Sequence, residues 1–344
     1  MLLCHILVAL QVMKRMIKYN ILITSVGRRV SLVRLFKKAF KDLNINGLVY
    51  AVDMDMHAPA LYVADKFQIV KRVTESGYVE QLCDICEENK INLIIPTIDT
   101  ELYILSQNTS LFNEKGVKLL VCNDNVNEIC KDKRNTESFF NDNNIPTPTL
   151  YDLNEAQKLV DNDYPLILKP AQGSSSIGVT KIKNLNELLF FFDYIDDAII
   201  QDYIKGDEYT IDILVDFDGK VRCAVPRLRM ETRAGEVSKA ITINNPTIID
   251  WSYKIAKALK GSVGCITIQC IKDNNEALKF IEINPRFGGG FPLAAEAGAN
   301  FPRWILQMLL DIELEHDLQE MWNEGQTMLR YDEGIFTTRE KLKL

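Results

Sequence analysis

The sequence predicts a protein of mixed α/β and α+β class, with a parallel sheet first and a region rich in β-hairpins after it. In the N-terminal part, short apolar strands alternate with helices, an order that gives a parallel sheet with helices on both faces. In the C-terminal part, strands follow one another across tight turns such as Asp218-Gly219. The length of 344 residues allows two or three domains.

The composition indicates a soluble globular protein, because 47% of the residues are hydrophobic and 25% are charged. A formal net charge of −7 argues against nucleic acid or an anionic membrane as the main partner. The eight cysteines do not form a disulfide framework in a chain of this length, and we expect reduced thiols in the cytoplasm. The three histidines lie outside any motif, so chemistry that needs a histidine base is not expected.

Residues 1–15 form a separate apolar stretch that ends in Lys14 and Arg15. A signal peptide carries its positive charge first, and a membrane span needs about 20 apolar residues. We therefore expect an N-terminal extension before a folded part that opens at Met16, with a short amphipathic segment as the alternative.

The N-terminal part contains three predicted strands, separated by two predicted helices. The strands cover 19–24, 47–52 and 93–96. The first helix starts near Val30, and the second covers 78–89. The glycine-rich dinucleotide fingerprint is absent after the first strand, where Gly27 stands alone, so Asp53 is a weak candidate for holding a ribose. The segment 97–101 follows the third strand, where open sheets bind substrates, although a helix cap explains it equally well.

A second region starts near Lys131, with a helix from Asp132 through Phe140 and a rigid turn at 144–148. The next strand, 164–170, carries Lys169 and leads into a glycine-serine loop at 173–179. The small residues and backbone amides of such a loop can close over phosphates, whereas a flexible hairpin tip is the alternative. The spacing is that of a Walker A loop, but the lysine precedes the loop instead of following it.

Further strands are predicted at 198–204, 209–217 and 220–225, with a turn at 205–208, and a helix follows from Pro246 to Lys260. The strand 263–271 then pairs with 279–284 through a turn at 273–275. A simple register of that hairpin brings Gln269 opposite Glu282.

The stretch from Lys279 to Gly290 organises the rest of the chain. It reads as a strand up to Asn284, so Glu282 and Asn284 point to the same face. Carboxylate and amide oxygens are hard ligands that suit Mg²⁺, and Arg286 adds a planar cation for phosphate oxygens. The alternative is a strand edge that carries polar residues toward solvent.

These pieces, in this order, resemble the ATP-grasp superfamily, and most closely its carbamoyl-phosphate-synthase-like ligases, from about Met16 to about Leu310. The most specific parts are Lys169-Pro170 with the glycine-serine loop, 201–208, and Gln269 with 282–286. The resemblance implies an N-terminal Rossmann-like pre-ATP-grasp domain followed by a two-part ATP-grasp fold. The expected parts are an extension at 1–15, a pre-ATP-grasp domain at 16–125, a linker helix and small lid subdomain at 126–205, a C-terminal subdomain at 206–312 and a tail at 313–344, which we expect to be irregular and peripheral.

The resemblance also implies roles for individual residues. Lys133 and Lys169 match the lysines on the nucleotide phosphates, and Gly173, Ser174, Ser175, Ser176 and Gly178 match the lid loop over the same phosphates. Gln201, Tyr203 and Ile204 match the strand that meets adenine, and Glu208 matches the acid that holds the ribose. Gln269, Glu282 and Asn284 match the magnesium ligands, and Arg286 matches the arginine that steadies the transferring phosphate. The loop departs from some relatives in lacking an arginine among its glycines.

A cluster of cations in an acidic protein marks a candidate substrate segment at 226–239. It contains Arg227, Arg229, Arg233 and Lys239. Arg233 is the candidate for binding the acyl phosphate or a substrate carboxylate. The alternative is a solvated strand and loop whose arginines pair with neighbouring glutamates.

The implied function is that of an ATP- and Mg²⁺-dependent ligase, with Mn²⁺ as a second candidate ion. It activates a small, amino-acid-like carboxylate as an acyl phosphate for attack by an amine. A catalytically silent nucleotide-binding sensor and a phosphotransferase that stops at a phosphorylated product are the alternatives. The expected partners are these small substrates, with a homodimer also open because the first domain of such proteins often supplies a dimer contact. The chain is too short for a complete two-half carbamoyl phosphate synthase.

Overall fold

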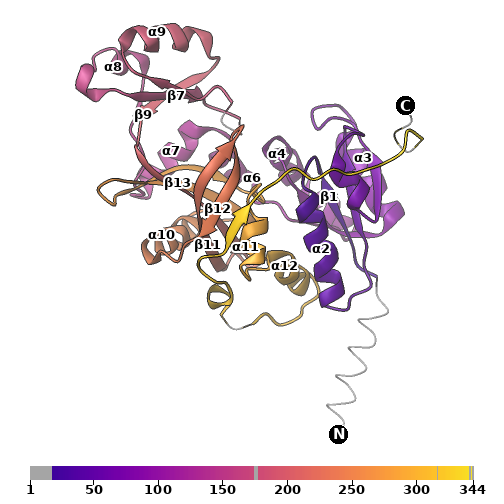
Figure 1. The fold of residues 1–344 in the computed structure, drawn as a ribbon. Helices are drawn as coiled ribbons and strands as arrows, with labels where there is room; N and C mark the ends of the chain where they lie inside the picture. Colours follow the sequence, from indigo (N-terminus) through magenta and orange to yellow (C-terminus); the bar gives the residue numbers. More distant parts are fainter. Residues whose placement is uncertain (1–17, 174–176, 316, 341, 343–344) are drawn as a thin grey trace. The chain divides into compact units, whose positions relative to one another are not determined.

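The structure is a computed structural model that describes residues 18–173, 177–315, 317–340 and 342 (Figure 1). The expected N-terminal extension and the three serines of the glycine-serine loop lie outside the described residues. Contacts within the chain divide it into two compact units. The first comprises the described residues within 1–121, 300–316 and 332–344, and the second comprises 122–299 and 317–331.

The first unit contains a five-stranded sheet in the order β3-β2-β1-β4-β5, and its strands pair in parallel. The predicted parallel sheet is therefore confirmed. Its elements in chain order are β1 (Asn20–Thr24), α2 (Val30–Asp42), β2 (Val49–Asp53), η1 (Pro59–Val63), β3 (Lys66–Ile69), α3 (Tyr78–Asn89), β4 (Ile91–Pro96), α4 (Asp99–Gln107), α5 (Thr109–Glu114), β5 (Lys118–Leu119) and α12 (Phe301–Leu309). The strand β3 was not predicted, because it has only four residues and just two of them, Phe67 and Ile69, are apolar.

Helix α12 packs against α2 and belongs to the first unit. This placement differs from the predicted C-terminal subdomain of residues 206–312, which assigned the helix to the other half of the chain. The sequence does not reveal it, because the buried face of α12 is equally suited to any apolar partner.

Among the described residues, no helix is long and apolar enough to cross a membrane.

The second unit holds two sheets. The smaller one has the strand order β6-β9-β7-β8, and Figure 1 shows α8 and α9 beside it. Its apolar face packs against Leu188 of α9. The elements are β6 (Leu150–Tyr151), α8 (Leu153–Ala156), η2 (Asp161–Asp163), β7 (Leu166–Pro170), β8 (Thr180–Ile182), α9 (Leu185–Tyr194) and β9 (Ala198–Asp202).

The larger sheet has the order β14-β13-β10-β11-β12-β15, and its neighbouring strands are antiparallel. Helices α6, α7 and α10 cover its apolar face. The elements are α6 (Asp124–Lys131), α7 (Lys133–Asp142), β10 (Gly206–Val215), β11 (Val221–Arg233), β12 (Glu236–Thr242), α10 (Pro246–Ala258), β13 (Gly264–Asp273), β14 (Leu278–Asn284), α11 (Pro292–Glu296), η3 (Leu318–Met321) and β15 (Thr327–Leu329).

Two expectations for this half of the chain are wrong, those for residues 205–208 and for the tail. The predicted turn at 205–208 is the start of β10, so Glu208 lies on a strand. The candidate substrate segment at 226–239, for which a solvated strand and loop was the alternative, forms a hairpin of β11 and β12 that turns at Ala234-Gly235. The tail is not peripheral, because β15 pairs with β12 and Met328 packs against the apolar cluster beneath it.

Strand alternation gives the larger sheet two different faces. One face carries the apolar core under the helices, with Ile211, Ile213, Ile266, Ile268 and Phe280 fully buried. The other face is polar, because strand residues two apart point the same way. Its members include Glu208, Thr210 and Asp212 on β10, Arg227 and Arg229 on β11, Thr267 and Gln269 on β13, and Glu282 and Asn284 on β14.

An ion pair is buried within this polar face. Arg227 donates from Nε to Asp212 Oδ2 at 2.7 Å and from Nη2 to Asp212 Oδ1 at 3.1 Å, and both side chains are inaccessible to solvent. Burial raises the pKa of Asp212, and the neighbouring guanidinium opposes that rise. Gly290 lies directly over the pair, since a Cβ there would come within 2.2 Å of Arg227 Nη1. The pair thus supports the glycine segment that follows β14.

Asp212→Asn should destabilise the second unit, because it leaves the Arg227 charge buried without a counter-charge. We expect the free energy of unfolding to fall by about 3–5 kcal/mol in chemical denaturation. Glu231→Gln is the matched control, because it breaks an exposed ion pair with Lys239 on the same sheet and should change little. Equal effects of the two substitutions would contradict this account of the buried pair.

Candidate active site

A cavity of about 260 Å³ lies between the two sheets of the second unit. Strand side chains of both sheets line it. The lining residues are Lys133, Pro148, Ile167, Lys169, Pro170, Gln172, Gly173, Ile177, Val179, Gln201, Asp202, Tyr203, Ile204, Glu208, Gln269, Ile271, Ile281 and Glu282. The structure therefore brings together most of the site residues expected from the sequence.

The smaller sheet places Lys169 in the cavity by strand alternation. Ile167 and Lys169 of β7 and Gln201 of β9 share one face, and Ile167 pairs with Gln201. Leu166 and Leu168 point to the opposite face and are fully buried. Burial lowers the pKa of Lys169 to about 8, Glu282 partly opposes this shift, and Lys133 adds to it. Lys169 is thus a buried cation that faces the carboxylate of the other sheet.

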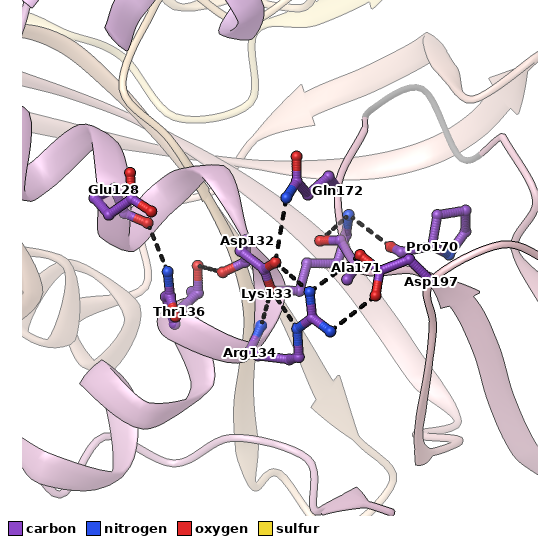
Figure 2. A network of polar contacts seen from close by, with 10 residues as sticks. Glu128, Asp132, Lys133, Arg134, Thr136, Pro170, Ala171, Gln172 and Asp197 are labelled. Atoms are coloured by element: carbon purple, nitrogen blue, oxygen red, sulfur yellow. Dashed lines mark hydrogen bonds and ion pairs between the residues drawn. The ribbon is translucent and has the colours of Figure 1, made fainter.

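Lys133 lies at the first turn of α7, beside the segment that follows β7 (Figure 2). Its Nζ donates to the carbonyl oxygens of Pro170 at 3.2 Å, Ala171 at 3.4 Å and Gly173 at 3.1 Å. Next to it, Asp132 caps α7 and pairs with Arg134 at 2.6 Å. Lys133 therefore holds the start of the glycine-serine loop and lines the cavity at the same time.

The described ends of the glycine-serine loop lie at the cavity. Gly173, Ile177 and Val179 line it, whereas Ser174, Ser175 and Ser176 lie outside the described residues. Gly178 does not line the cavity. Its φ of +74° is a backbone conformation that residues with side chains rarely adopt. A Cβ at this position would also come within 3.0 Å of the Pro170 ring.

A β-bulge in β14 turns Glu282 toward the cavity. Gln269 pairs with Glu282 as predicted, but the next pair is Cys270 with Phe280, so β14 carries one extra residue. As a result Ile281 and Glu282 both line the cavity, while Phe280 and Ile283 both face the core. The bulge thus reverses which side chains of β14 face the cavity, and Glu282 is the first residue after this change.

Three oxygen-bearing side chains lie close together on β13 and β14, and Glu282 is the central one. Gln269 lies opposite it, and Asn284 follows two residues later. Asn284 Oδ1 accepts a hydrogen bond from Arg286 Nη2 at 3.1 Å, so the arginine is positioned beside these oxygens. Neither Asn284 nor Arg286 is among the residues that line the cavity itself.

This donor set fits a magnesium ion that arrives with phosphate oxygens. Gln269, Glu282 and Asn284 offer hard oxygen ligands, but one carboxylate supplies a single negative charge. Mg²⁺ commonly binds through one or two carboxylates together with substrate phosphates. Across 18–173, 177–315, 317–340 and 342, no cluster of three or more histidine, cysteine or acidic residues could hold a metal alone. The set therefore suits a metal–nucleotide complex better than a permanently bound ion.

The remaining lining is largely apolar and was only partly expected. Tyr203 and Ile204 were predicted, and Lys181 lies 3.8 Å above the Tyr203 ring. Ile167, Ile271 and Ile281 were missed, as was Pro148. Continuous apolar runs do not show which side faces a cavity, and the bulge that exposes Ile281 has no sequence signature. The result is a slot with apolar walls beside polar groups, which is typical of small-molecule sites.

Glu208 reaches the cavity from β10 and pairs with Arg229 of β11. The ion pair is partly buried, with side-chain exposures of 35% for Glu208 and 9% for Arg229. Arg229 Nη1 also donates to Gln269 Oε1 at 3.4 Å. Arg229 was expected on a substrate segment, and it contacts two lining residues of the cavity, Glu208 and Gln269.

The other cations of the hairpin do not meet at the cavity. Arg227 is buried in the Asp212 pair, and Lys239 pairs with Glu231 at 2.6 Å on the surface. Arg233 is exposed at the hairpin tip, where its backbone pairs with Glu236, and it is not a lining residue of the cavity. The catalytic role predicted for Arg233 stays a prediction.

The weaker candidates of the first unit have structural partners. Asp53 accepts hydrogen bonds from the backbone amides of Gly27 at 2.7 Å and Asp55 at 2.9 Å. Thr97 donates to the Ser25 carbonyl at 2.6 Å. Glu101 is fully buried against Tyr78, and burial raises its pKa. These residues tie together the loops at the carboxyl ends of the strands.

Family models match three parts of the chain. Residues 21–120 match the PylC-like N-terminal domain, residues 150–234 match the C-terminus of D-Ala–D-Ala ligase, and residues 194–332 match the ATP-grasp of a biosynthetic pathway with the Ter operon. The last two models together match residues 150–332, and this part of the chain belongs to the ATP-grasp superfamily. The predicted fold class, a pre-ATP-grasp domain followed by a two-part ATP-grasp fold, is therefore confirmed.

Curated relatives of this ATP-grasp chain include two kinds of ligase. It is 23% identical over 221 residues to carbamoyl-phosphate synthase of Methanobrevibacter smithii, covering 60% of this chain and 60% of that protein. It is 35% identical over 101 residues to D-alanine–D-alanine ligase A of Bacillus cereus, covering 27% of this chain and 33% of that protein. The chain thus spans less than two thirds of either relative.

Solved structures share the fold over most of the chain. The biotin carboxylase domain of Hydrogenobacter thermophilus 2-oxoglutarate carboxylase, a complex with MgADP, ADP and bicarbonate, superimposes with a TM-score of 0.72. Its sequence is 20% identical, and the alignment covers 89% of this chain and 73% of that chain. This likeness supports the ATP-grasp architecture.

Nucleotide affinity of the ATP-grasp site should depend on the protonation of Lys169. The free protein holds this amine protonated below about pH 8 and neutral above it. We expect only the charged amine to bind phosphates, so the affinity for Mg-ATP should be constant below about pH 7. It should then fall by up to about tenfold per pH unit above pH 8, until the pKa of the bound form is reached.

Calorimetric titrations from pH 7 to 9.5 measure this dependence. Lys169→Arg is the control, because a guanidinium stays charged over the whole range and should flatten the profile. If the wild type and this variant lose affinity in parallel, Lys169 is not the titrating group.

Proposed function

We propose that this protein is an ATP- and Mg²⁺-dependent carboxylate–amine ligase that acts on small, amino-acid-like substrates. The observation that carries the proposal is the cavity, which places Lys169 on one sheet and Glu282 with Gln269 on the other. Its apolar wall accommodates a flat base next to charges that suit a triphosphate. The curated relatives are ligases, and the chain matches part of their length, which supports the same reaction class.

In this proposal each group has a distinct task toward the nucleotide. Lys133 and Lys169 neutralise the phosphates, with the ends of the glycine-serine loop above them. Tyr203, Ile204 and Gln201 meet the adenine. Glu208 accepts hydrogen bonds from the ribose hydroxyls.

Gln269, Glu282 and Asn284 would hold Mg²⁺, or Mn²⁺ in its place, together with phosphate oxygens. When bound, the ion neutralises charge on the transferring phosphoryl group. Arg286 is fixed by its bond to Asn284 and presents a permanent cation at the same position. These side chains position the reactants, and no protein nucleophile is required.

The proposed reaction has two steps. A substrate carboxylate oxygen attacks the γ-phosphorus of ATP, which forms an acyl phosphate and releases ADP. An amine then attacks the acyl carbon, the C–O bond to phosphate breaks, and the products are an amide, inorganic phosphate and a proton. The exposed hairpin tip with Arg233 is the candidate for binding the substrate carboxylate.

Several finer points belong to the same proposal. A homodimer and a cytoplasmic location remain predictions, as do the boundaries of the subdomains within the second unit.

A nucleotide-binding sensor would have less need of Gln269, Glu282 and Asn284 together, which favours the enzyme.

ADP release tests the proposal, with Mg²⁺-ATP offered alongside a panel of amino acids and small carboxylates, with and without an amine. We expect substrate-dependent ADP release that falls by at least about 100-fold in Glu282→Ala, because the variant removes the one carboxylate of the donor set. Glu276→Gln is the matched control, since it removes an exposed carboxylate from the turn of the same hairpin and should leave turnover unchanged. Tight ATP binding with no turnover on any pair would favour the sensor.

Arg233→Ala tests the substrate role of the hairpin tip once an acid is known. We expect a KM for that acid raised by about tenfold or more, with the KM for ATP unchanged, because a charge-assisted bond is lost. Lys239→Ala on the same hairpin serves as the control. An unchanged KM for the acid in Arg233→Ala would remove this residue from the site.

A further inference from the structure

Arg229 connects two residues of the cavity wall to the tip of the β11–β12 hairpin. Its Nη1 pairs with Glu208 Oε1 and donates to Gln269 Oε1 at 3.4 Å. Its Nη2 donates to the Gly235 carbonyl at 3.0 Å, in the turn of the hairpin. Arg229 does not line the cavity, so it acts on the cavity through these contacts.

The arrangement follows from the register of three neighbouring strands. Tyr209 pairs with Leu228, which makes Glu208 and Arg229 the next facing positions on β10 and β11. Thr210 pairs with Gln269 on the other side of β10. A long side chain from β11 can therefore reach both a β10 and a β13 residue on the polar face.

We propose that Arg229 is a positioning residue that orients Glu208 for the ribose and links ribose binding to the hairpin tip. This inference rests on the proposed function, because it assigns Glu208 to the ribose of ATP. It adds a residue that the reaction itself does not touch.

The chemistry of the carboxylate supports the orienting role. An ionised carboxylate accepts about four hydrogen bonds through its two oxygens. Arg229 engages Oε1, which leaves Oε2 for hydroxyl donors. Charge-assisted hydrogen bonds to a carboxylate are stronger than bonds between neutral groups. Without Arg229 the Glu208 side chain would lose a fixed rotamer and its counter-charge together.

The planar fork of arginine supports the link to the hairpin. Nη1 and Nη2 are held in one plane, so a shift of Glu208 toward a ligand moves the bond to Gly235 as well. The hairpin is anchored separately by Arg330, whose Nη1 contacts Glu236 Oε2 at 3.2 Å and whose Nη2 donates to the Gly289 carbonyl. Among the described residues, Arg330 makes no hydrogen bond or ion pair with Glu208 or Gln269, which makes it the matched control.

Equilibrium binding of three probes to the full chain tests the proposal. The probes are Mg-ATP, Mg-2′,3′-dideoxy-ATP and Mg-tripolyphosphate. The first has a complete ribose, the second lacks the 2′ and 3′ hydroxyls, and the third has no ribose. The proteins are the wild type, Arg229→Gln, Arg229→Lys, Glu208→Gln and Arg330→Gln. Arg229→Lys keeps the charge next to Glu208 and covers the case in which Arg229→Gln does not fold.

The wild type should bind ATP at least about tenfold more tightly than dideoxy-ATP. This preference should disappear in Arg229→Gln and Glu208→Gln, while tripolyphosphate binds all proteins with similar affinity. Arg229→Lys should retain part of the preference, and Arg330→Gln should retain all of it. Hydrogen exchange at 231–238 should slow when ATP is added to the wild type, and should slow less with dideoxy-ATP.

Two results would overturn the inference while ATP binding stands. One is an unchanged preference for ATP in Arg229→Gln, or in Arg229→Lys if only that variant folds. The other is an equal loss for all three probes, which would mean that Arg229 only maintains the sheet. Absence of any ATP binding to the wild type would instead reject the proposed function, and the inference with it.

Discussion

The alternation of side chains along β-strands is the constraint on which this site depends. Each sheet of the second unit uses one face for an apolar core and the other for the cavity. In the smaller sheet, Leu166 and Leu168 pack against α9 while Ile167 and Lys169 face the cavity. In the larger sheet the bulge at Ile281 and Glu282 resets the alternation, so the carboxylate reaches the cavity although Phe280 and Ile283 remain in the core. The two sheets therefore keep their cores on opposite sides and line one cavity between them.

Much of this site could be predicted from the sequence, because its polar residues lie on regular strands and short hairpins. The turn at 273–275 makes β13 and β14 neighbours, which brings Gln269 and Glu282 close together. The register at the turn would continue to Ile281 opposite Gln269, and the bulge shifts that pairing to Glu282. The strand ending at Pro170 likewise fixes the direction of Lys169. The bulge could not be predicted, since the pattern Phe-Ile-Glu-Ile fits an uninterrupted strand equally well, and the apolar lining residues Ile271 and Ile281 were missed with it.

The cations of the hairpin show a second limit of sequence reasoning. Arg227, Arg229 and Arg233 look alike in the sequence, yet the structure gives each a different environment. Arg227 is buried with Asp212, Arg229 bridges Glu208 and Gln269, and Arg233 is exposed at the tip. These differences arise from cross-strand neighbours, whose identity depends on long-range register. The role of β15 in extending the sheet is long-range in the same way, because it pairs with β12 across some 90 residues of sequence.

We propose that a nucleotide occupies the cavity between the two sheets of the second unit. Photolabelling with 8-azido-ATP in the presence of Mg²⁺, followed by peptide mapping, tests it directly. The account predicts label on peptides that contain Tyr203 and Ile204 or Ile271 and Ile281, with protection by excess ATP. Label confined to peptides from residues 18–121, with the same protection by ATP, would contradict the account, because the nucleotide would then bind in the first unit.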